Sequence, residues 1–371
     1  MLIGTLKEVK NQEHRVGLTP SSVYELVHHN HRVMVQKGAG AGIGISDDKY
    51  IASGAIIVDT PEEIFAKANM IVKVKEPQPN ECSLLREGQI LFTYLHLAPD
   101  APQTHALLKS GCIAIAYETV TDRFGALPLL SPMSEVAGRM SIQAGAKCLE
   151  IAHGGKGLLL GGVAGVNAAK VVILGGGVVG TNALRIAIGM EADVTVIDVS
   201  LARLRELDDR YGASLNTIYS TRNMIAEHVA TADLVIGAVL VPGAAAPKLV
   251  TKEMVASMDK GSVLVDVAID QGGCFETSYP TTHDIPTYNL DGIVHYCVAN
   301  MPAGAARTST HALNNSTLPF VLALANKGYK QALLDDAHLM NGLNIYRGQV
   351  TCEAVANAHK LLYKRALDVL H

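Results

Sequence analysis

The chain alternates short apolar runs with segments in which apolar residues recur at helical spacing. In the first 128 residues the apolar runs predict strands at Leu2–Leu6, Arg32–Gln36, Ala55–Val58, Met70–Val74, Gln89–Tyr94 and Cys112–Ala116. The first helix should begin at Pro20 with Thr19 as its N-cap, because the missing N–H of proline costs nothing in a first turn. Strands separated by helices in this way predict a parallel sheet that is covered on both faces.

A second series of strands and helices follows Leu127–Met133, whose two prolines are typical of a hinge. We expect a helix from Ser134, its predicted N-cap, to about His153, and a loop at the glycine-rich run Gly154–Gly165. Further strands are predicted at Val171–Leu174, at the β-branched run that ends in Asp198, and at Leu215–Tyr219, Leu234–Gly237, Ser262–Val267 and His295–Val298. This succession is typical of the six-stranded Rossmann sheet.

The segment Lys170–Asp198 combines a strand, a glycine turn, a helix and a second strand. Its glycines Gly175, Gly177 and Gly180 fit the pattern G-x-G-x-x-G. Asp198 follows them at close to the offset of roughly 20 residues expected for an acid that binds a ribose hydroxyl. Gly175 would permit the tight turn, Gly177 the approach of a pyrophosphate, and Gly180 close packing of helix on strand. A purely structural turn is the alternative, but the flanking strands and the acid together favour dinucleotide binding.

These elements divide the chain into two parts. We predict an α/β protein with two Rossmann-like domains, each with a parallel sheet, joined by two long helices around a central cleft. Residues 129–302 would form the NAD-binding Rossmann domain. Residues 1–128 plus 303–371 would form the substrate-binding, catalytic domain, because a helix from about Ala303 to Asn326 returns the chain and the residues up to His371 also have helical spacing.

Composition narrows the class of protein. A length of 371 residues exceeds what one hydrophobic core usually organises, which also indicates about two domains. With a formal net charge of −4 and no basic block, nucleic acid is not an expected partner. No signal peptide or membrane span is visible, so we expect a cytoplasmic protein. The six cysteines contain no C-x-x-C pair, which favours reduced, mostly buried thiols and predicts no metal site.

Ligands of open parallel sheets collect beyond the carboxyl ends of the strands, so residues there are candidates for chemistry. Lys75 directly follows one predicted strand, and His96 follows another by two residues. Arg15 and Lys75 form a cation pair that suits a small carboxylate. His96 suits proton transfer near neutral pH. Taken singly, cations at such positions are more often solvated charges, and a histidine after a strand is more often a hydrogen-bonded structural residue. The shared sheet edge, which faces the cofactor, favours a role in chemistry.

The corresponding edge of the second sheet carries Val239, Leu240, Asp270, Asn300 and Met301. The nicotinamide end of a dinucleotide should lie near these strand ends, and Asp270 is the acid best placed for chemistry. Because Asp before Gln-Gly-Gly is also good turn chemistry, position alone leaves Asp270 equally open to a structural role.

Two long segments are similar to signatures of a known family. KEVKNQEHRVGLTP (Lys7–Pro20) resembles the N-terminal signature of the alanine dehydrogenase and pyridine nucleotide transhydrogenase family, and LLLGGVAGVNAAKVVILGGGVVG (Leu158–Gly180) resembles its second signature. Further similarity in MSEVAGRMSIQAGA, GSVLVDVAIDQGGCFET and HYCVANMP extends it over essentially the whole chain. The resemblance implies reversible, NAD-dependent oxidative deamination of L-alanine to pyruvate and ammonia by a homo-oligomer, typically a hexamer.

The resemblance also implies roles for single residues. Positions matching Arg15 and Lys75 hold the substrate carboxylate, and those matching His96 and Asp270 are the catalytic pair, with the step that each serves left open. Asp198 implies NAD rather than NADP, since its carboxylate accepts from a free 2′-hydroxyl and repels a 2′-phosphate. The NAD contacts implied by the family fall at Ser134, Val178, Asp198, Arg203, Ser220, Val239 and Asn300.

Three other functions remain open at this point. The NAD-binding component of a nicotinamide nucleotide transhydrogenase shares both signatures, but it works beside membrane segments and would not need the full alanine-binding set. A dehydrogenase for another amino acid would keep the cleft and change its lining. A non-catalytic NAD-binding regulator would have no use for the substrate-binding and catalytic residues.

Overall fold

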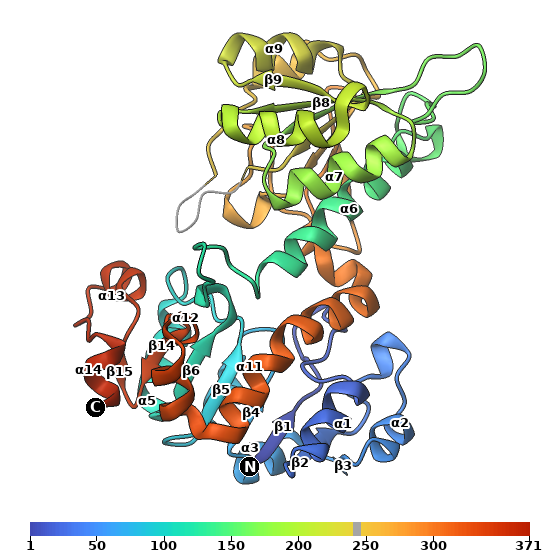
Figure 1. Cartoon of the computed structure of the whole chain (residues 1–371). Helices are drawn as coiled ribbons and strands as arrows, with labels where there is room; N and C mark the ends of the chain where they lie inside the picture. The colour runs from blue at the N-terminus through green and yellow to red at the C-terminus, as the bar shows by residue number, and fades with distance from the viewer. Residues whose placement is uncertain (240–245) are drawn as a thin grey trace. The chain divides into compact units, whose positions relative to one another are not determined.

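The computed structural model describes residues 1–239 and 246–371, which form two compact units (Figure 1). Unit 1 comprises Met1–Met133 and Ala306–His371, and unit 2 comprises Ser134–Ala305. Leu240, a predicted cofactor contact, lies outside the described residues. No helix within the described residues is long and apolar enough to cross a membrane.

Unit 1 is built on one sheet. Its strands are β1 (Leu2–Thr5), β2 (Arg32–Gln36), β3 (Ile56–Val58), β4 (Met70–Val72), β5 (Ile90–Thr93), β6 (Ile113–Ala116), β14 (Leu343–Tyr346) and β15 (Gln349–Val350). Its helices are α1 (Pro20–His28), α2 (Asp47–Ala52), α3 (Pro61–Lys67), α4 (Pro79–Cys82), α5 (Ala101–Ser110), α11 (Ala306–Asp335), α12 (Ala337–Met340), α13 (Glu353–His359) and α14 (Ala366–Leu370), with the 3-10 helices η1 (Ala41–Ile43) and η2 (Tyr117–Thr119). The order is β15-β14-β6-β5-β4-β1-β2-β3, and β1 to β6 are parallel. The strands after β1 are added first on one side (β2, β3) and then on the other (β4 to β6), so the topological switch point lies between β1 and β4.

Both faces of this sheet are buried, because successive strand residues point to opposite sides. In β4, Val72 packs with side chains of α1 and α11, whereas Ile71 packs with side chains of α3 and α5. Figure 1 shows α11 lying across the strands in the middle of the sheet. The predicted cap of α1 is confirmed, since the Thr19 side chain accepts a hydrogen bond from the Ser22 N–H.

Unit 2 is built on a second sheet. Its strands are β7 (Lys170–Leu174), β8 (Asp193–Asp198), β9 (Asn216–Tyr219), β10 (Leu234–Gly237), β11 (Val263–Asp266), β12 (Thr287–Leu290) and β13 (Ile293–Tyr296). Its helices are α6 (Ser131–Cys148, which begins in unit 1), α7 (Val178–Gly189), α8 (Leu201–Tyr211), α9 (Arg222–Thr231) and α10 (Lys252–Ala256), with the 3-10 helices η3 (Ile151–His153), η4 (Gly212–Ser214), η5 (Ile269–Gln271) and η6 (Met301–Ala305). The order β12-β13-β11-β10-β7-β8-β9 is the predicted Rossmann order with one added antiparallel strand, β12.

The helix that follows the glycine turn is held closely from one side. A Cβ at Gly138 of α6 would lie 2.2 Å from the Val179 carbonyl oxygen of α7, so only glycine permits this approach. Arg139 Nε also donates to Asn182 Oδ1 across the two helices at 3.0 Å. The packing of α6 therefore fixes where α7 begins.

The predicted fold class, two Rossmann-like domains with mainly parallel sheets, is confirmed for each unit. The central cleft stays a prediction. The predicted burial of the cysteines is also confirmed, since five of the six are buried.

The strands β12, β14 and β15 were not predicted, and residues 343–350 do not have the helical structure expected of the C-terminal segment. The reason is hairpin geometry. Asp291 and Gly292 between β12 and β13 have φ of 53° and 92°, and Arg347 and Gly348 between β14 and β15 have φ of 45° and 82°. Two successive positive φ angles are required by the tight two-residue turns that join antiparallel strands.

Two helix boundaries also differ from prediction. The helix α6 begins at Ser131, so Ser134 lies inside it and is not its N-cap. Pro132 occupies the first turn, where its missing N–H costs nothing, and this allows the earlier start. The return helix α11 begins at Ala306, after the 3-10 helix η6, and continues to Asp335 across a non-helical residue, Gly328.

Candidate functional site

The carboxyl edge of the unit 1 sheet gathers the predicted substrate side chains. Lys75 follows β4, and His96 follows β5, its neighbour in the sheet. Two acids that were not singled out in the sequence share this edge: Glu8 follows β1 and Glu118 follows β6.

Arg15 is held by an acid two residues before it. Its Nε and Nη2 atoms donate to the two carboxylate oxygens of Glu13 at 2.7 and 2.6 Å, and its Nη1 contacts Met133 Sδ at 3.0 Å. Arg15 is only 2 % exposed. Burial opposes the charge, but the Glu13 carboxylate more than offsets it and raises the pKa of Arg15. The guanidinium is therefore a fixed cation with a fixed orientation.

Lys75 is partly exposed beside another carboxylate. Its Nζ lies 3.8 Å from Glu76 Oε2, and its side chain is 13 % exposed. Burial raises the pKa of Glu76, but Lys75 and Lys10 outweigh burial, so the net shift of this pKa is downward. Glu76 thus stays ionised beside the Lys75 ammonium.

Beneath Lys75 lies a buried ionic triad that sequence reasoning missed. Lys73, which is fully buried, donates to Glu81 Oε1 at 2.8 Å and lies 3.1 Å from Glu8 Oε2. Glu8 Oε1 also accepts the Val74 N–H at 2.7 Å. Burial raises the pKa of the Glu8 carboxyl despite its pairing with Lys73. The triad anchors the main chain where it leaves β4 toward Lys75.

His96 lies between an aromatic ring and a carboxylate. Its imidazole stacks on Tyr94 with centroids 5.8 Å apart, and its Nδ1 is 3.9 Å from Glu118 Oε1. The Tyr94 hydroxyl donates to the Leu129 carbonyl at 2.5 Å. Burial raises the pKa of Tyr94, against the opposing effect of Arg15, so the phenol stays protonated. His96 itself remains half exposed, with a side-chain exposure of 48 %.

In unit 2 the glycine turn has three different local environments. Gly175 has a φ of 97°, which L side chains rarely adopt. A Cβ at Gly180 would lie 1.8 Å from the Gly175 carbonyl oxygen, so α7 can pack on the turn only with glycine there. A Cβ at Gly177, in contrast, would meet nothing within 4 Å. Gly177 is also the N-cap of α7, whose first N–H groups have no partners within the helix.

Asp198 and Arg203 hold this turn from the end of β8. Asp198 Oδ2 accepts the Gly176 N–H at 2.6 Å and Oδ1 accepts the Ser200 N–H at 2.8 Å. Arg203 Nε donates to the Gly176 carbonyl at 2.7 Å, and its Nη2 donates to Thr181 Oγ1 at 2.5 Å. Each carboxylate oxygen of Asp198 has a second lone pair, so the acid can accept a further hydrogen bond.

Asp270 and Asn300 are brought together at the ends of neighbouring strands. The Asn300 N–H lies 3.2 and 3.3 Å from the two carboxylate oxygens of Asp270, and Asn300 has a φ of 55°. The loop that carries Asp270 is organised by Asp266, a fully buried acid at the end of β11 that was not predicted. Asp266 accepts the Cys274 N–H at 2.9 Å and the Ser278 hydroxyl at 2.6 Å.

The other predicted contacts occupy varied positions. Val178 is the first residue of α7 and is 44 % exposed, and Ser220 follows β9 with its N–H on the Asp198 carbonyl. Val239 follows β10, and its Cγ2 would lie 3.0 Å from a Cβ at Gly175. Met301 is buried in a core cluster of unit 2, so its side chain has a packing role. Ser134 is half-buried within α6.

These residues fit a dinucleotide. An N-terminal helix end with open space at Gly177 suits a pyrophosphate, because free N–H groups and partial positive charge face the anion. Asp198 at the end of the second strand suits a ribose hydroxyl. The Rossmann order of the sheet agrees with a nicotinamide cofactor.

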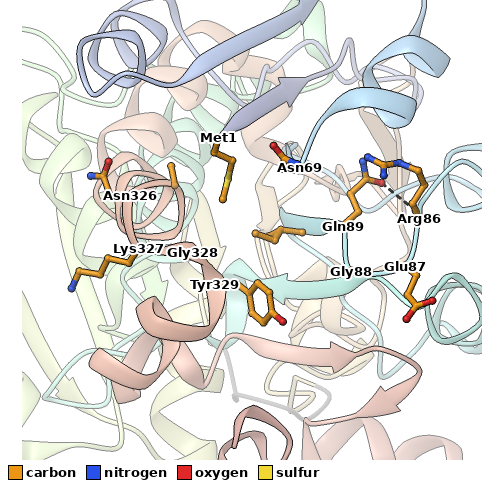
Figure 2. Close-up of a pocket in the computed structure, with 12 residues that line it drawn as sticks. Met1, Asn69, Arg86, Glu87, Gly88, Gln89, Asn326, Lys327, Gly328 and Tyr329 are labelled. Atoms are coloured by element: carbon orange, nitrogen blue, oxygen red, sulfur yellow. Dashed lines mark hydrogen bonds between the residues drawn. The ribbon is translucent and has the colours of Figure 1, made fainter.

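A cavity of about 570 Å³ in unit 1 lies away from these residues (Figure 2). Its lining includes Met1, Asn69 and Gln89, which precede or begin strands of the parallel sheet, together with residues near Gly328 of α11. Because the strands are parallel, this is the amino edge of the sheet, opposite to the edge that carries Lys75 and His96. The cavity is therefore separate from the candidate site.

Known families match both parts of the chain. The model described as "Alanine dehydrogenase/PNT, N-terminal domain" matches residues 4–137, and "Alanine dehydrogenase/PNT, C-terminal domain" matches residues 141–353. The chain belongs to the alanine dehydrogenase/PNT family. Among members of the family, proteins named alanine dehydrogenase from Halomonas elongata and Methanococcus maripaludis are each 57 % identical to it and are covered over 100 % of both chains.

Solved structures of the alanine dehydrogenase/PNT family agree with this assignment. An L-alanine dehydrogenase is 50 % identical, with 97 % of this chain and 99 % of that chain covered and a TM-score of 0.95. A transhydrogenase from Sinorhizobium meliloti is 25 % identical, with coverage of 94 % and 100 % and a TM-score of 0.84. Membership of this family and the Rossmann-like fold together imply a nicotinamide cofactor.

Proposed function

We propose that the chain is an NAD-dependent L-alanine dehydrogenase, which converts L-alanine, NAD and water reversibly to pyruvate, ammonium, NADH and a proton. The observation that carries the proposal is the identity of 57 % over the full length of relatives named alanine dehydrogenase. The gathering of Lys75 and His96 at one edge of the unit 1 sheet supports it further.

Arg15 and Lys75 bind the carboxylate of alanine. Because Glu13 already fixes the Arg15 guanidinium, little side-chain entropy is lost when the substrate binds. Two cations at one end of a small substrate set the direction of its Cα–H bond, which is an orientation effect on the rate. Lys75 can shift from Glu76, 3.8 Å away, to the incoming carboxylate.

The remaining chemistry is removal of hydride and proton transfer. The turn at Gly177 and the Asp198 carboxylate would hold NAD, which would supply the acceptor for a hydride from Cα and so allow an iminium carbon to form on the substrate. His96 takes a proton from the water that adds to this carbon and then moves protons on the tetrahedral adduct. Asp270 balances the iminium charge and relays a proton from the amine. Expulsion of ammonia yields pyruvate.

Asp198 selects NAD over NADP in this proposal. Its carboxylate would accept from the free 2′-hydroxyl and repel a 2′-phosphate. We expect Asp198→Ala to reduce the preference for NAD by at least about tenfold, measured as the ratio of kcat/KM for NAD and NADP. An unchanged ratio would remove Asp198 from cofactor selection.

The transhydrogenase component is less well supported, since the similar transhydrogenase structure is only 25 % identical. A dehydrogenase for another amino acid would share the carboxylate site and differ in preferred side chain. We also propose a homohexamer in the cytoplasm, as the resemblance implies. Light scattering coupled to size-exclusion chromatography tests the oligomer, and a monomer would contradict it.

The direct test is NADH formation from L-alanine and NAD at alkaline pH, with NADP and a panel of other L-amino acids and D-alanine for comparison. We expect L-alanine with NAD to give the highest kcat/KM. No turnover of L-alanine by the purified chain would reject the proposal, and faster turnover of another amino acid would replace the substrate. As a test of His96, we expect His96→Ala to keep NAD affinity and to lose turnover by about two to four orders of magnitude.

A further inference from the structure

We infer that Glu118 is the positioning residue of His96: its carboxylate holds the main chain of His96 in an unfavourable conformation and faces Nδ1 of its ring. The inference rests on the proposed role of His96 in proton transfer. It concerns side chains of unit 1 alone.

The main chain at His96 needs an external restraint. His96 has a φ of 50°, in the left-handed region that side chains other than glycine rarely adopt. Such a conformation is strained and persists only where surrounding contacts impose it. The His96 side chain is 48 % exposed, so its own burial does not supply the restraint.

The Glu118 carboxylate supplies it through two consecutive N–H groups. The Leu95 N–H lies 3.2 Å from each carboxylate oxygen, and the His96 N–H donates to Oε1 at 2.6 Å. Hydrogen bonds to an ionised acceptor are stronger than those between neutral groups. The Glu118 side chain is 14 % exposed, so these bonds compete little with water.

Glu118 is itself well placed by the sheet. It lies in η2, directly after β6, and β6 pairs with β5 in the register Thr93↔Ala116. Tyr117, the first residue after β6, is buried, and its ring packs edge-to-face against the Tyr94 ring with the centroids 5.1 Å apart. The two segments that carry the histidine and the acid are thus held at fixed spacing.

The ring of His96 is also constrained on two sides. Tyr94 stacks on one face with an interplanar angle of 4°, and Glu118 Oε1 lies 3.9 Å from Nδ1. At 3.9 Å this carboxylate is too far for a hydrogen bond to the ring, so Glu118 positions the ring chiefly through the main chain of His96. Glu118 therefore acts on the reaction through His96 and touches no reacting atom.

The test is a double-mutant cycle with Glu118→Ala and His96→Ala. In the wild-type background, Glu118→Ala should lower kcat by about 10- to 100-fold, because a misplacement of about 1 Å can cost that much. The KM for L-alanine should change by less than about threefold. In the His96→Ala background, Glu118→Ala should change kcat by less than about twofold. A kcat within twofold of wild type, or an equal loss in both backgrounds, would overturn the inference.

Glu118→Gln provides a second test in case the Glu118→Ala variant does not fold. Its amide oxygen can still accept the His96 N–H but carries no charge, so we expect a smaller loss of kcat, of about 3- to 10-fold. Glu150→Ala is the matched control, because exposed Glu150 lies 3.8 Å from His153 Nε2 at a place without a proposed role. Its kcat should equal that of wild type.

A crystal structure of Glu118→Ala, or of Glu118→Gln if the alanine variant does not fold, separates this inference from the proposed function. We expect His96 to leave the left-handed region in Glu118→Ala, and to show a mixture of the two conformations in Glu118→Gln, whose amide oxygen still accepts the His96 N–H. If wild type fails to deaminate L-alanine, the proposed function fails, and this structure alone decides the inference. A His96 that keeps its positive φ and its stacking on Tyr94 would overturn it.

Discussion

The two units build their candidate sites from different materials. In unit 1 the edge of the sheet carries buried ion pairs: Arg15 with Glu13, and Lys73 with the two carboxylates of Glu8 and Glu81. Acids of both units accept main-chain N–H groups, but in unit 2 the corresponding edge is made of glycine backbone. The candidate site of unit 1 is therefore defined mainly by paired charges, and that of unit 2 mainly by the shape of its backbone.

The difference has an energetic meaning. Removing ions from water costs several kcal/mol for each ion, and their attraction often only offsets that cost. A glycine turn costs conformational entropy in place of solvation. We infer that the buried ions of unit 1 lower its stability but hold charges in fixed positions. In unit 2, glycines in place of larger residues let a ligand approach the backbone closely.

The largest test of the contrast is to break the buried triad. Lys73→Met leaves Glu8 and Glu81 buried without a cation, so the free energy of unfolding should fall by about 3–5 kcal/mol in urea titrations. Lys67→Met, which removes a surface pair with Glu63, should cost less than about 1 kcal/mol. Adding Glu8→Gln to Lys73→Met should recover part of the loss. Equal costs for the two lysines would show that the triad carries no special electrostatic role.

In unit 2 the matching test compares two glycines of one turn. Gly180→Ala drives a Cβ into the Gly175 carbonyl and should lower the free energy of unfolding by about 1–3 kcal/mol or more. Gly177→Ala places its Cβ in open space and should leave stability within about 1 kcal/mol. The dissociation constant of the Gly177→Ala variant for NADH, measured by fluorescence, should nevertheless rise. If Gly177→Ala binds NADH as tightly as wild type does, the open space at Gly177 is not a phosphate site.

Alkaline pH should lower the free energy of unfolding of both units, because each unit contains a buried thiol. In this respect the two units should not differ. Burial raises the pKa of the Cys112 thiol in unit 1 and of the Cys148 thiol in unit 2, each to about 11. An unfolded thiol has a pKa of about 8.5, so the stabilisation is complete below pH 8.5 and is lost as pH rises through about 11. We expect the free energy of unfolding to fall by about 1–2 kcal/mol or more over this range. A flat profile from pH 8.5 to 11 would contradict the burial of these thiols.

The smallest effect concerns helix caps. Thr19 in unit 1 and Ser200 in unit 2 each accept an N–H three residues on, but Thr19 is 3 % exposed and Ser200 is exposed. Thr19→Ala should cost about 1–2 kcal/mol and Ser200→Ala about 0.5–1 kcal/mol, measured by thermal unfolding. The reverse order would show that burial of a cap does not strengthen it here.

Much of the fold was predictable because both sheets are parallel in their interiors. Continuous apolar runs such as Val171–Leu174 are buried on both faces and are easily recognised. The antiparallel edges were missed, although Asp291-Gly292 is a strong turn signal in the sequence. Arg347-Gly348 is a weaker signal, since arginine rarely adopts positive φ.

The site was predictable where position along a strand decides it. Lys75 and His96 could be found because they follow strands, and Gly175 and Gly180 because their spacing is specific. Their partners could not be found in the same way. Glu118 lies 22 residues from His96 in the chain, and nothing local distinguishes it from a surface acid. Only the pairing of β5 with β6 brings the two together.

The order of segments along the chain has a consequence for synthesis on the ribosome. Unit 2 is encoded without interruption between the two parts of unit 1, so it can fold while unit 1 is still unfinished. Until α11 emerges, the face of the unit 1 sheet that carries Val72 and Phe92 lacks its cover of Leu313, Val321 and Leu324. Residues 1–133, the part of unit 1 that is made first, therefore complete their core only after unit 2 has been synthesised.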